Sequence, residues 1–286
     1  MALFRFGFHF ASVTYPGLAT DQLFGRIAEV ATAAEQNGFD SLWLPDHAHQ
    51  NRMGGGPDAP MFEAYTLLGA LAVATQRARL ATLVSPVTFR PPSLLAKIIA
   101  TLDVISGGRA VLGIGAAWDT EEHAAYGVDF PGIGERQDRL EEAVQICRSM
   151  LTEEVTSFAG KHYQVSDAHN APRPLQASVP IMVAGGGERR TLRTVARYGD
   201  ACNVSGTPDV IRHKLEVLAG HCADAGRDLA EITTTAAIIP PDSVDELVQT
   251  VGERLEAGLD GVIFLANNTP DAEAVASWGQ ALTSAF

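Results

Sequence analysis

Short apolar segments alternate with amphipathic segments along the whole chain. The apolar segments are nonpolar at nearly every position rather than at every second one, as in 110-AVLGIG-115 and 261-GVIFLA-266. This pattern is typical of parallel strands that are buried on both faces. Eight strands are predicted, over residues 4–10, 39–45, 79–87, 109–116, 179–184, 200–205, 231–239 and 260–266.

Helix boundaries fall between these strands. Ser243 precedes Glu246 by three residues, which is a capping-box pattern, and Gly258 follows the last position of the apolar stripe. At other boundaries a glycine ends a helix, or a cap residue precedes a proline at the first helical position. These boundaries are expected at Gly38, Thr207-Pro208, Gly226 and Thr269-Pro270.

The alternation of strands and helices predicts an α/β fold, a (β/α)8 (TIM) barrel in which residues 1–286 form one domain. The interval 117–178 is longer than one helix and its turns. It contains a predicted helix over 135–151 and then a hairpin that turns at Ala159-Gly160. We expect an insertion over about 152–178 between strands four and five, which is either a lid over the site or a structural flap.

The net charge and the cysteines restrict the expected binding partners and the expected cellular compartment. A formal net charge of −13 argues against a nucleic-acid partner, and an anionic cofactor would require a local group of basic residues. The three cysteines have no metal-type spacing, so we expect reduced thiols in a cytoplasmic protein. The first residues lack a signal-peptide pattern, and no apolar stretch is long enough to span a bilayer.

In a (β/α)8 barrel the reacting groups lie where the strands end. The second strand ends at Asp46-His47, which could provide a proton donor beside a redox ring or a histidine that only bonds the backbone. His9 on the first strand faces either the lumen, where a ligand could meet it, or the surrounding helices. Trp118 either forms a wall of a substrate pocket or covers the barrel mouth. His47 and Asp46 are the catalytic candidates, and His9 and Trp118 the substrate-pocket candidates.

A glycine run follows the fifth strand. Gly185-Gly186-Gly187 precedes a helix start that carries Arg189, Arg190 and Arg193. Glycines allow close approach of the backbone to an anion, and a helix N-terminus presents free N–H groups. A phosphate site is therefore expected here. The run is not a GxGxxG fingerprint, so it does not imply a dinucleotide.

Other chemistries find little support in the sequence. It contains no HExxH spacing, and the acidic residues form no shared cluster, so we expect no metal site. It also lacks the GxSxG elbow of a serine hydrolase.

Four stretches carry a family resemblance, and together they cover nearly the whole chain in order. They are 37-NGFDSLWLPDH-47, 79-RLATLVSPVTFRPPSLLAKIIATLDVISGGRAVLGIGAAWDTEEHAAYG-127, 135-ERQDRLEEAVQICRSML-151 and 180-PIMVAGGGERRTLRTVARYGDACN-203. The chain resembles the luciferase-like monooxygenase superfamily and, within it, the oxidoreductases that depend on coenzyme F420, a deazaflavin.

The resemblance implies roles for particular residues. His47 would lie close to the redox ring as proton donor or substrate contact, and a cis peptide bond between Leu83 and Val84 would support the ring. Ala116 and Ala117 would line the cofactor. The glycines 185–187 and the helix start with Arg189 would hold the phosphate. Such proteins transfer a hydride between the ring and a substrate or, with FMN, oxygenate a substrate with O2.

Two departures from the family affect the expected substrate. Relatives that oxidise a sugar phosphate carry a carboxylate at the position of Trp118 and a tryptophan in the loop after His47, where this chain has residues 48–51. A less charged organic substrate is therefore expected. The acidic tail of a deazaflavin would favour basic residues near the barrel mouth, such as Arg52, Arg90 or Lys161.

Three functions remain open at this stage, and a fourth, a phosphate-binding barrel isomerase, is less favoured because the expected catalytic carboxylate or lysine at the strand ends is missing. The first is an F420-dependent oxidoreductase that acts on a small organic molecule. The second is an FMN-dependent monooxygenase that receives reduced flavin from a separate reductase. The third is a non-catalytic flavin-binding protein. Relatives are often homodimers, so we expect a homodimer.

Overall fold

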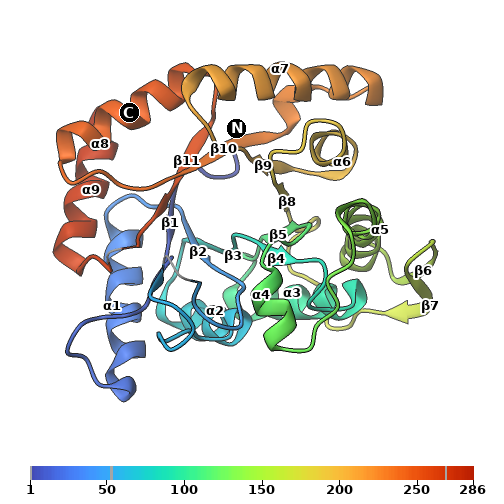
Figure 1. Ribbon diagram of the computed structural model, residues 1–286, viewed down its shortest axis with the longest axis horizontal. Helices are drawn as coiled ribbons and strands as arrows, with labels where there is room; N and C mark the ends of the chain where they lie inside the picture. Colours follow the sequence, from blue (N-terminus) through green and yellow to red (C-terminus); the bar gives the residue numbers. More distant parts are fainter. Residues whose placement is uncertain (1, 52–53, 268) are drawn as a thin grey trace.

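The computed structural model describes residues 2–51, 54–267 and 269–286, and its parallel strands form a barrel surrounded by helices (Figure 1). The strands are hydrogen-bonded in the order β3-β2-β1-β11-β10-β9-β8-β5-β4. A parallel bridge between Leu80 and Ala110 joins β3 to the start of β5 and closes the ring. The barrel strands are β1 (Phe6–His9), β2 (Ser41–Leu44), β3 (Arg79–Thr82), β4 (Ser85–Pro86), β5 (Leu112–Gly115), β8 (Ile181–Ala184), β9 (Ala201–Asn203), β10 (Thr233–Ile238) and β11 (Gly261–Leu265). The predicted (β/α)8 barrel is confirmed, with β3 and β4 as the two parts of the third predicted strand.

The helices cover the outside of the barrel. They are α1 (Leu23–Gln36), α2 (Ala64–Ala74), α3 (Pro92–Ser106), α4 (Thr120–Ala125), α5 (Ile133–Thr152), α6 (Thr191–Tyr198), α7 (Pro208–Ala225), α8 (Val244–Glu256) and α9 (Ala272–Ala285). The Ser243 side chain accepts a hydrogen bond from the backbone N–H of Glu246 at 3.2 Å, so the predicted cap of α8 is confirmed. The start predicted at Thr269-Pro270 was wrong. The Asp271 carboxylate caps α9 instead by accepting from Ala274 N at 2.9 Å, and Thr269 lies outside the helix with a φ of 45°.

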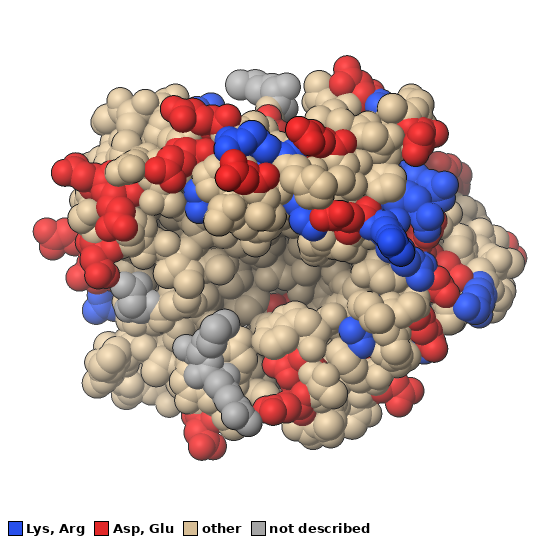
Figure 2. Space-filling view, turned by 45° about the horizontal axis from the view of Figure 1, so that its top comes forward, with Lys and Arg blue, Asp and Glu red and all other residues tan. Residues whose placement is uncertain are grey.

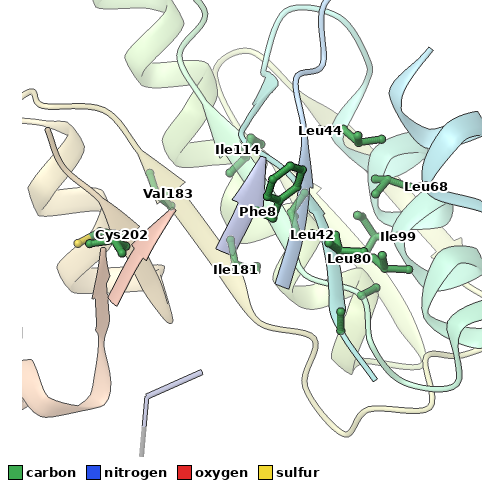
Figure 3. Packing of buried hydrophobic residues seen from close by; sticks show 14 of the residues in the cluster. Phe8, Leu42, Leu44, Leu68, Leu80, Ile99, Ile114, Ile181, Val183 and Cys202 are labelled. Atoms are coloured by element: carbon green, nitrogen blue, oxygen red, sulfur yellow. The ribbon is translucent and has the colours of Figure 1, made fainter. Parts of the chain in front are cut away.

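The strand residues alternate between the helices and the barrel lumen. Phe8, Leu42 and Leu80 belong to a large buried cluster that also contains helix residues such as Leu68 and Ile99 (Figure 3). A second cluster consists of residues from the strands and the N-terminal segment: Phe4, Trp43, Ala81, Val111, Met182, Ala201 and Ile263. Because successive strand side chains point to opposite faces, this second cluster fills the lumen. Burying one such large side chain contributes about 1.5–3 kcal/mol.

The insertion after α5 forms the predicted hairpin, with strands β6 (Val155–Ala159) and β7 (Gln164–His169). The Glu142 carboxylate on α5 accepts hydrogen bonds from the backbone N–H groups of the turn residues Lys161, His162 and Tyr163. Figure 1 shows the hairpin beside α5 at the edge of the molecule. Anchoring to α5 favours a structural flap, and a lid function stays a prediction.

Two further expectations concern the cysteines and membrane-spanning segments. Cys147, Cys202 and Cys222 are free and buried, as predicted. None of the helices in the described ranges has the length and apolar character to cross a membrane.

Candidate functional site

His47 follows β2 and is held by a carboxylate from the other side of a loop. Its Nδ1 lies 2.9 Å from Oε2 of Glu122, which belongs to α4 and is 1% exposed. The second oxygen of Glu122 accepts from the backbone N–H of Ala48 at 2.5 Å. An ionised carboxylate can only accept hydrogen bonds, so Nδ1 of His47 carries the hydrogen. The other ring nitrogen, Nε2, makes no hydrogen bond with another described residue.

The hydrogen-bonded pair shifts the pKa of His47 and the pKa of Glu122. Burial alone would lower the pKa of His47, but the hydrogen bond and negative charge of Glu122 outweigh it and raise that pKa above its usual value. Burial would raise the pKa of Glu122, but its hydrogen bonds, chiefly that from His47, lower it instead. An imidazole whose pKa is raised by a neighbouring carboxylate is suited to hold and release a proton.

Trp118 lies against the same histidine. Its ring meets the His47 ring edge-on, with the ring centroids 5.5 Å apart, and 62% of Trp118 is exposed. Asp119 also lies close, and ligand atoms of His47, Asp119 and Glu122 all lie within 4.8 Å of one another. The expectation that acidic groups form no cluster was therefore wrong. Hydrogen bonds to His47 and to the backbone already engage the Glu122 oxygens.

Asp46, the neighbour of His47, is part of a different network. Its carboxylate is 4% exposed and accepts from Arg90 Nη1 and from Ser85 Oγ, each at 2.6 Å. The hydroxyl of Tyr65 lies 2.7 Å from the same Ser85 oxygen. Asp46 thus joins the end of β2 to β4 and to the start of α3, which positions the segment that carries His47.

The expected cis peptide bond between Leu83 and Val84 is present, between β3 and β4. A Cβ atom at Gly113 would lie 1.9 Å from the carbonyl oxygen of Thr82, and one at Gly115 would lie 2.8 Å from Val84 Cγ2. These glycines therefore make room for the bulge at residues 83–84.

The two alanines that the family resemblance places at the cofactor follow directly after β5. Ala116 is half-buried, and its carbonyl accepts from Arg136 Nε at 2.9 Å. Ala117 has a φ of 65°, in the left-handed region that residues other than glycine rarely adopt. These alanines lead directly to Trp118, which contacts His47.

The glycine run lies at the end of β8, and α7 fixes it from outside. Lys214 Nζ donates to the Gly186 carbonyl and to the Glu188 carboxylate, each at 2.7 Å, and His221 Nε2 lies 2.8 Å from the Glu188 carbonyl. Gly185 has a φ of 133°, and a Cβ atom at Gly186 would meet nothing within 4 Å. The backbone N–H groups of Gly186 and Gly187 have no backbone acceptor within the described ranges, so this loop can bind an anion.

One protein family matches almost the whole chain. The family described as luciferase-like monooxygenase matches residues 3–282. The chain belongs to the luciferase-like monooxygenase family.

Among curated members of this family, an F420-dependent glucose-6-phosphate dehydrogenase of Kineococcus radiotolerans is 40% identical over 177 residues. That match covers 62% of this chain and 51% of the dehydrogenase, so the chain spans about half the length of the curated relatives of this kind. An uncharacterised protein of Mycobacterium tuberculosis is 31% identical over 214 residues, which cover 70% of this chain and 75% of that protein.

Solved structures agree on the luciferase-like fold. An F420-dependent secondary alcohol dehydrogenase in complex with an F420-acetone adduct has a TM-score of 0.83 at 20% identity, over 99% of both chains. The monooxygenase RslO1 from Streptomyces bottropensis has a TM-score of 0.81 at 19% identity, over 98% of this chain and 99% of that chain. At these identities the similarity concerns the fold.

The basic residues expected to attract an anionic cofactor of this luciferase-like protein are mostly paired. Arg190 binds Asp138, Arg193 lies 3.9 Å from Glu141, and Lys161 also binds Asp138. Arg90 forms ion pairs with Asp46 and Glu63, while Arg52 lies outside the described residues. Arg189 is exposed and makes no ion pair with another described residue, which leaves it available to a phosphate.

His9, the remaining sequence candidate, lies in the lumen and not against the helices. It alternates with Phe8 and Phe10, which belong to the cluster packed against the helices. The sequence reading missed Glu122 and Lys214. The pattern Asp119-x-x-Glu122, which caps α4, was the available indication of the first. No sequence pattern indicates that Lys214 reaches the glycine run.

Proposed function

We propose that this luciferase-like protein is an F420-dependent oxidoreductase that transfers a hydride between the deazaflavin and a small organic substrate. The observation that carries the proposal is the His47–Glu122 pair, in a chain that also has the cis bond at residues 83–84 and is 40% identical over 177 residues to a relative named as F420-dependent. The pair provides a proton where a redox ring would lie, which is what hydride chemistry at a C–O or C–N bond requires.

The described residues are suited to hold such a cofactor. The bulge at Leu83 and Val84, with Ala116 and Ala117, would support the ring. Gly185, Gly186, Gly187 and Arg189 would bind the phosphate through backbone N–H groups and one guanidinium. When bound, the deazaflavin supplies or accepts the hydride.

The roles of the two catalytic candidates differ. His47 holds the proton at Nε2 and transfers it to or from the substrate, while Glu122 keeps the ring oriented through Nδ1. Asp46 is a positioning residue, because Arg90 and Ser85 occupy its carboxylate. Trp118 forms the outer wall of the substrate pocket through its edge contact with His47.

The substrate we propose is less charged than a sugar phosphate. Figure 2 shows a hollow in the middle of one face, and its floor consists mainly of residues other than Asp, Glu, Lys and Arg. The exposed Trp118 adds apolar surface at the mouth.

A titration of the apoprotein with oxidised F420 and, separately, with FMN tests the cofactor assignment through tryptophan fluorescence. We expect F420 to bind at least about tenfold more tightly than FMN, a difference of about 1.4 kcal/mol. Tighter FMN binding would favour the two-component monooxygenase, which would use a separate reductase. F420 binding without turnover of any alcohol, imine or electron-poor alkene would favour a non-catalytic binding protein.

We also propose that the protein is a cytoplasmic homodimer. The outer surfaces of α2 and α3 expose Val73, Leu94 and Ile105, with half or more of each side chain accessible. A helix surface this apolar is typical of an interface. Analytical ultracentrifugation of wild-type protein and Val73→Glu tests this proposal, and a monomeric wild-type protein would contradict it.

A further inference from the structure

His9 is a buried polar side chain without a partner. It is 5% exposed, and neither of its ring nitrogens makes a hydrogen bond to another described residue. Phe8 and Phe10 on either side of it pack against the helices, so the His9 side chain points into the lumen.

None of the described residues forms a hydrogen bond with the His9 ring, and Nε1 of Trp43 is also without a partner among them. His9 pairs with Trp43 on β2 and with Leu265 on β11 in the strand register. A buried imidazole with two unused nitrogens costs free energy unless a ligand completes its hydrogen bonds.

The pKa values of the two histidines shift in opposite directions. Burial, followed by the positive charge of His47, lowers the pKa of His9 to about 3, so His9 is neutral at physiological pH. The Glu122 pair instead raises the pKa of His47 against the effect of burial. When two titratable groups of one site are driven apart in this way, they have different tasks. His47 handles the proton, and His9 can only donate or accept a hydrogen bond.

Building on the proposed function, we propose that His9 is a specificity residue: it hydrogen-bonds the reacting oxygen of an alcohol or carbonyl substrate and so selects these compounds over alkenes of the same shape. His9 exchanges no proton in this role. An alkene of equal size would leave the buried imidazole unpaired, and a site built to hydrogen-bond a substrate rejects such analogues strongly.

The test uses cyclohexanone and methylenecyclohexane, which share a ring and differ in C=O against C=CH2. Calorimetry measures the Kd of each, with and without saturating oxidised F420. Wild-type protein should bind cyclohexanone at least about tenfold more tightly, as expected for one buried hydrogen bond. His9→Leu should abolish this preference, and His9→Asn, which keeps a donor and an acceptor, should retain most of it. His169→Leu, on the exposed strand β7, is the control and should change nothing.

Thermal melting of the apoprotein provides a second readout. His9→Leu removes an unpaired buried polar group, so its Tm should equal or exceed that of wild type, whereas a structural histidine would lower it. A lower Tm, no preference in wild type, or a preference that survives in His9→Leu would each overturn the proposal. A His9→Leu variant that loses F420 affinity but keeps the preference would place His9 against the cofactor, and also overturns it. Failure of wild type to bind F420 would reject the proposed function, while the cofactor-free titrations would still test His9.

Discussion

The two halves of the site are built in different ways. At the ends of β2 to β5, the histidine corner consists of buried and half-buried side chains that reach one another across the sequence: His47 with Glu122, and Asp46 with Ser85 and Arg90. At the end of β8, the glycine run at residues 185–187 offers exposed backbone and is followed by Arg189, which makes no ion pair with another described residue. The first half depends on tight packing, and the second depends on open space.

This difference fits the two proposed tasks. Proton transfer requires a group held in one orientation with a shifted pKa, which buried partners provide. Holding a phosphate requires N–H groups and charge at the surface, which local backbone geometry provides. Substitutions should therefore affect stability at the histidine corner and affinity at the glycine run.

The largest effect is expected for Gly113→Ala. The new Cβ atom would lie 1.9 Å from the backbone oxygen of Thr82, which cannot move without moving the bulge. The free energy of unfolding should fall by about 3 kcal/mol or more. Gly186→Ala is the matched control, with nothing within 4 Å of its Cβ position, and should change stability by less than about 0.5 kcal/mol. If urea denaturation shows that both variants lose the same free energy of unfolding, the distinction between a packed half and an open half of the site is wrong.

Next in size is the acid response of His9. Its pKa is lowered to about 3 in the folded protein, so between that value and about 6.5 the unfolded chain binds one more proton. Stability should therefore fall as the pH falls, by about 1.4 kcal/mol per pH unit from this group. His9→Leu should lose that slope between pH 4.5 and 6.5 in urea titrations, and His169→Leu should keep it. Identical slopes in wild type and His9→Leu would contradict the burial of a neutral His9.

A smaller loss is expected for Asp46→Asn. The substitution removes the charge that Arg90 pairs with, although Glu63 still contacts Arg90 at 2.8 Å. Unfolding should become about 2 kcal/mol easier, somewhat less than for a fully buried pair. The pH profile of deazaflavin reduction should not move. An unchanged stability with a displaced pH profile would instead make Asp46 a proton-transfer residue.

The smallest change belongs to the glycine run. Arg189→Ala should weaken F420 binding about tenfold without affecting stability, because an exposed guanidinium contributes one charged hydrogen bond. Lys161→Ala, whose amine already pairs with Asp138, should change the Kd by less than about twofold. If Lys161→Ala has the larger effect in fluorescence titrations, the cofactor approaches over the hairpin and not over α6.

The sequence predicted the parts that depend on local pattern. The strands follow from continuous apolar segments, the helix ends at Gly226 and Ser243 follow from capping rules, and the glycine run follows from the strand–glycine–helix order. The cis bond at residues 83–84 came from family resemblance alone. The start of α9 was misjudged because Asp271 is a stronger cap than Thr269 before proline.

The sequence did not reveal the partners of the site residues. Glu122 lies 75 positions from His47, and Arg90 lies 44 positions from Asp46. Only closure of the barrel brings these groups together, so no local rule pairs them. The same holds for the arginines after the glycine run, of which Arg190 and Arg193 face acidic residues of α5.

The His47–Glu122 pair is the centre of the account, and an NMR pH titration of the His47 ring tests it most directly. The carboxylate raises the pKa of His47 above its usual value, so His47 should gain its proton at higher pH in wild type than in Glu122→Gln. The stability that this pair adds should be complete below about pH 6.5 and be lost as the pH rises through the raised pKa. A His47 pKa that is the same in wild type and in Glu122→Gln would contradict the account.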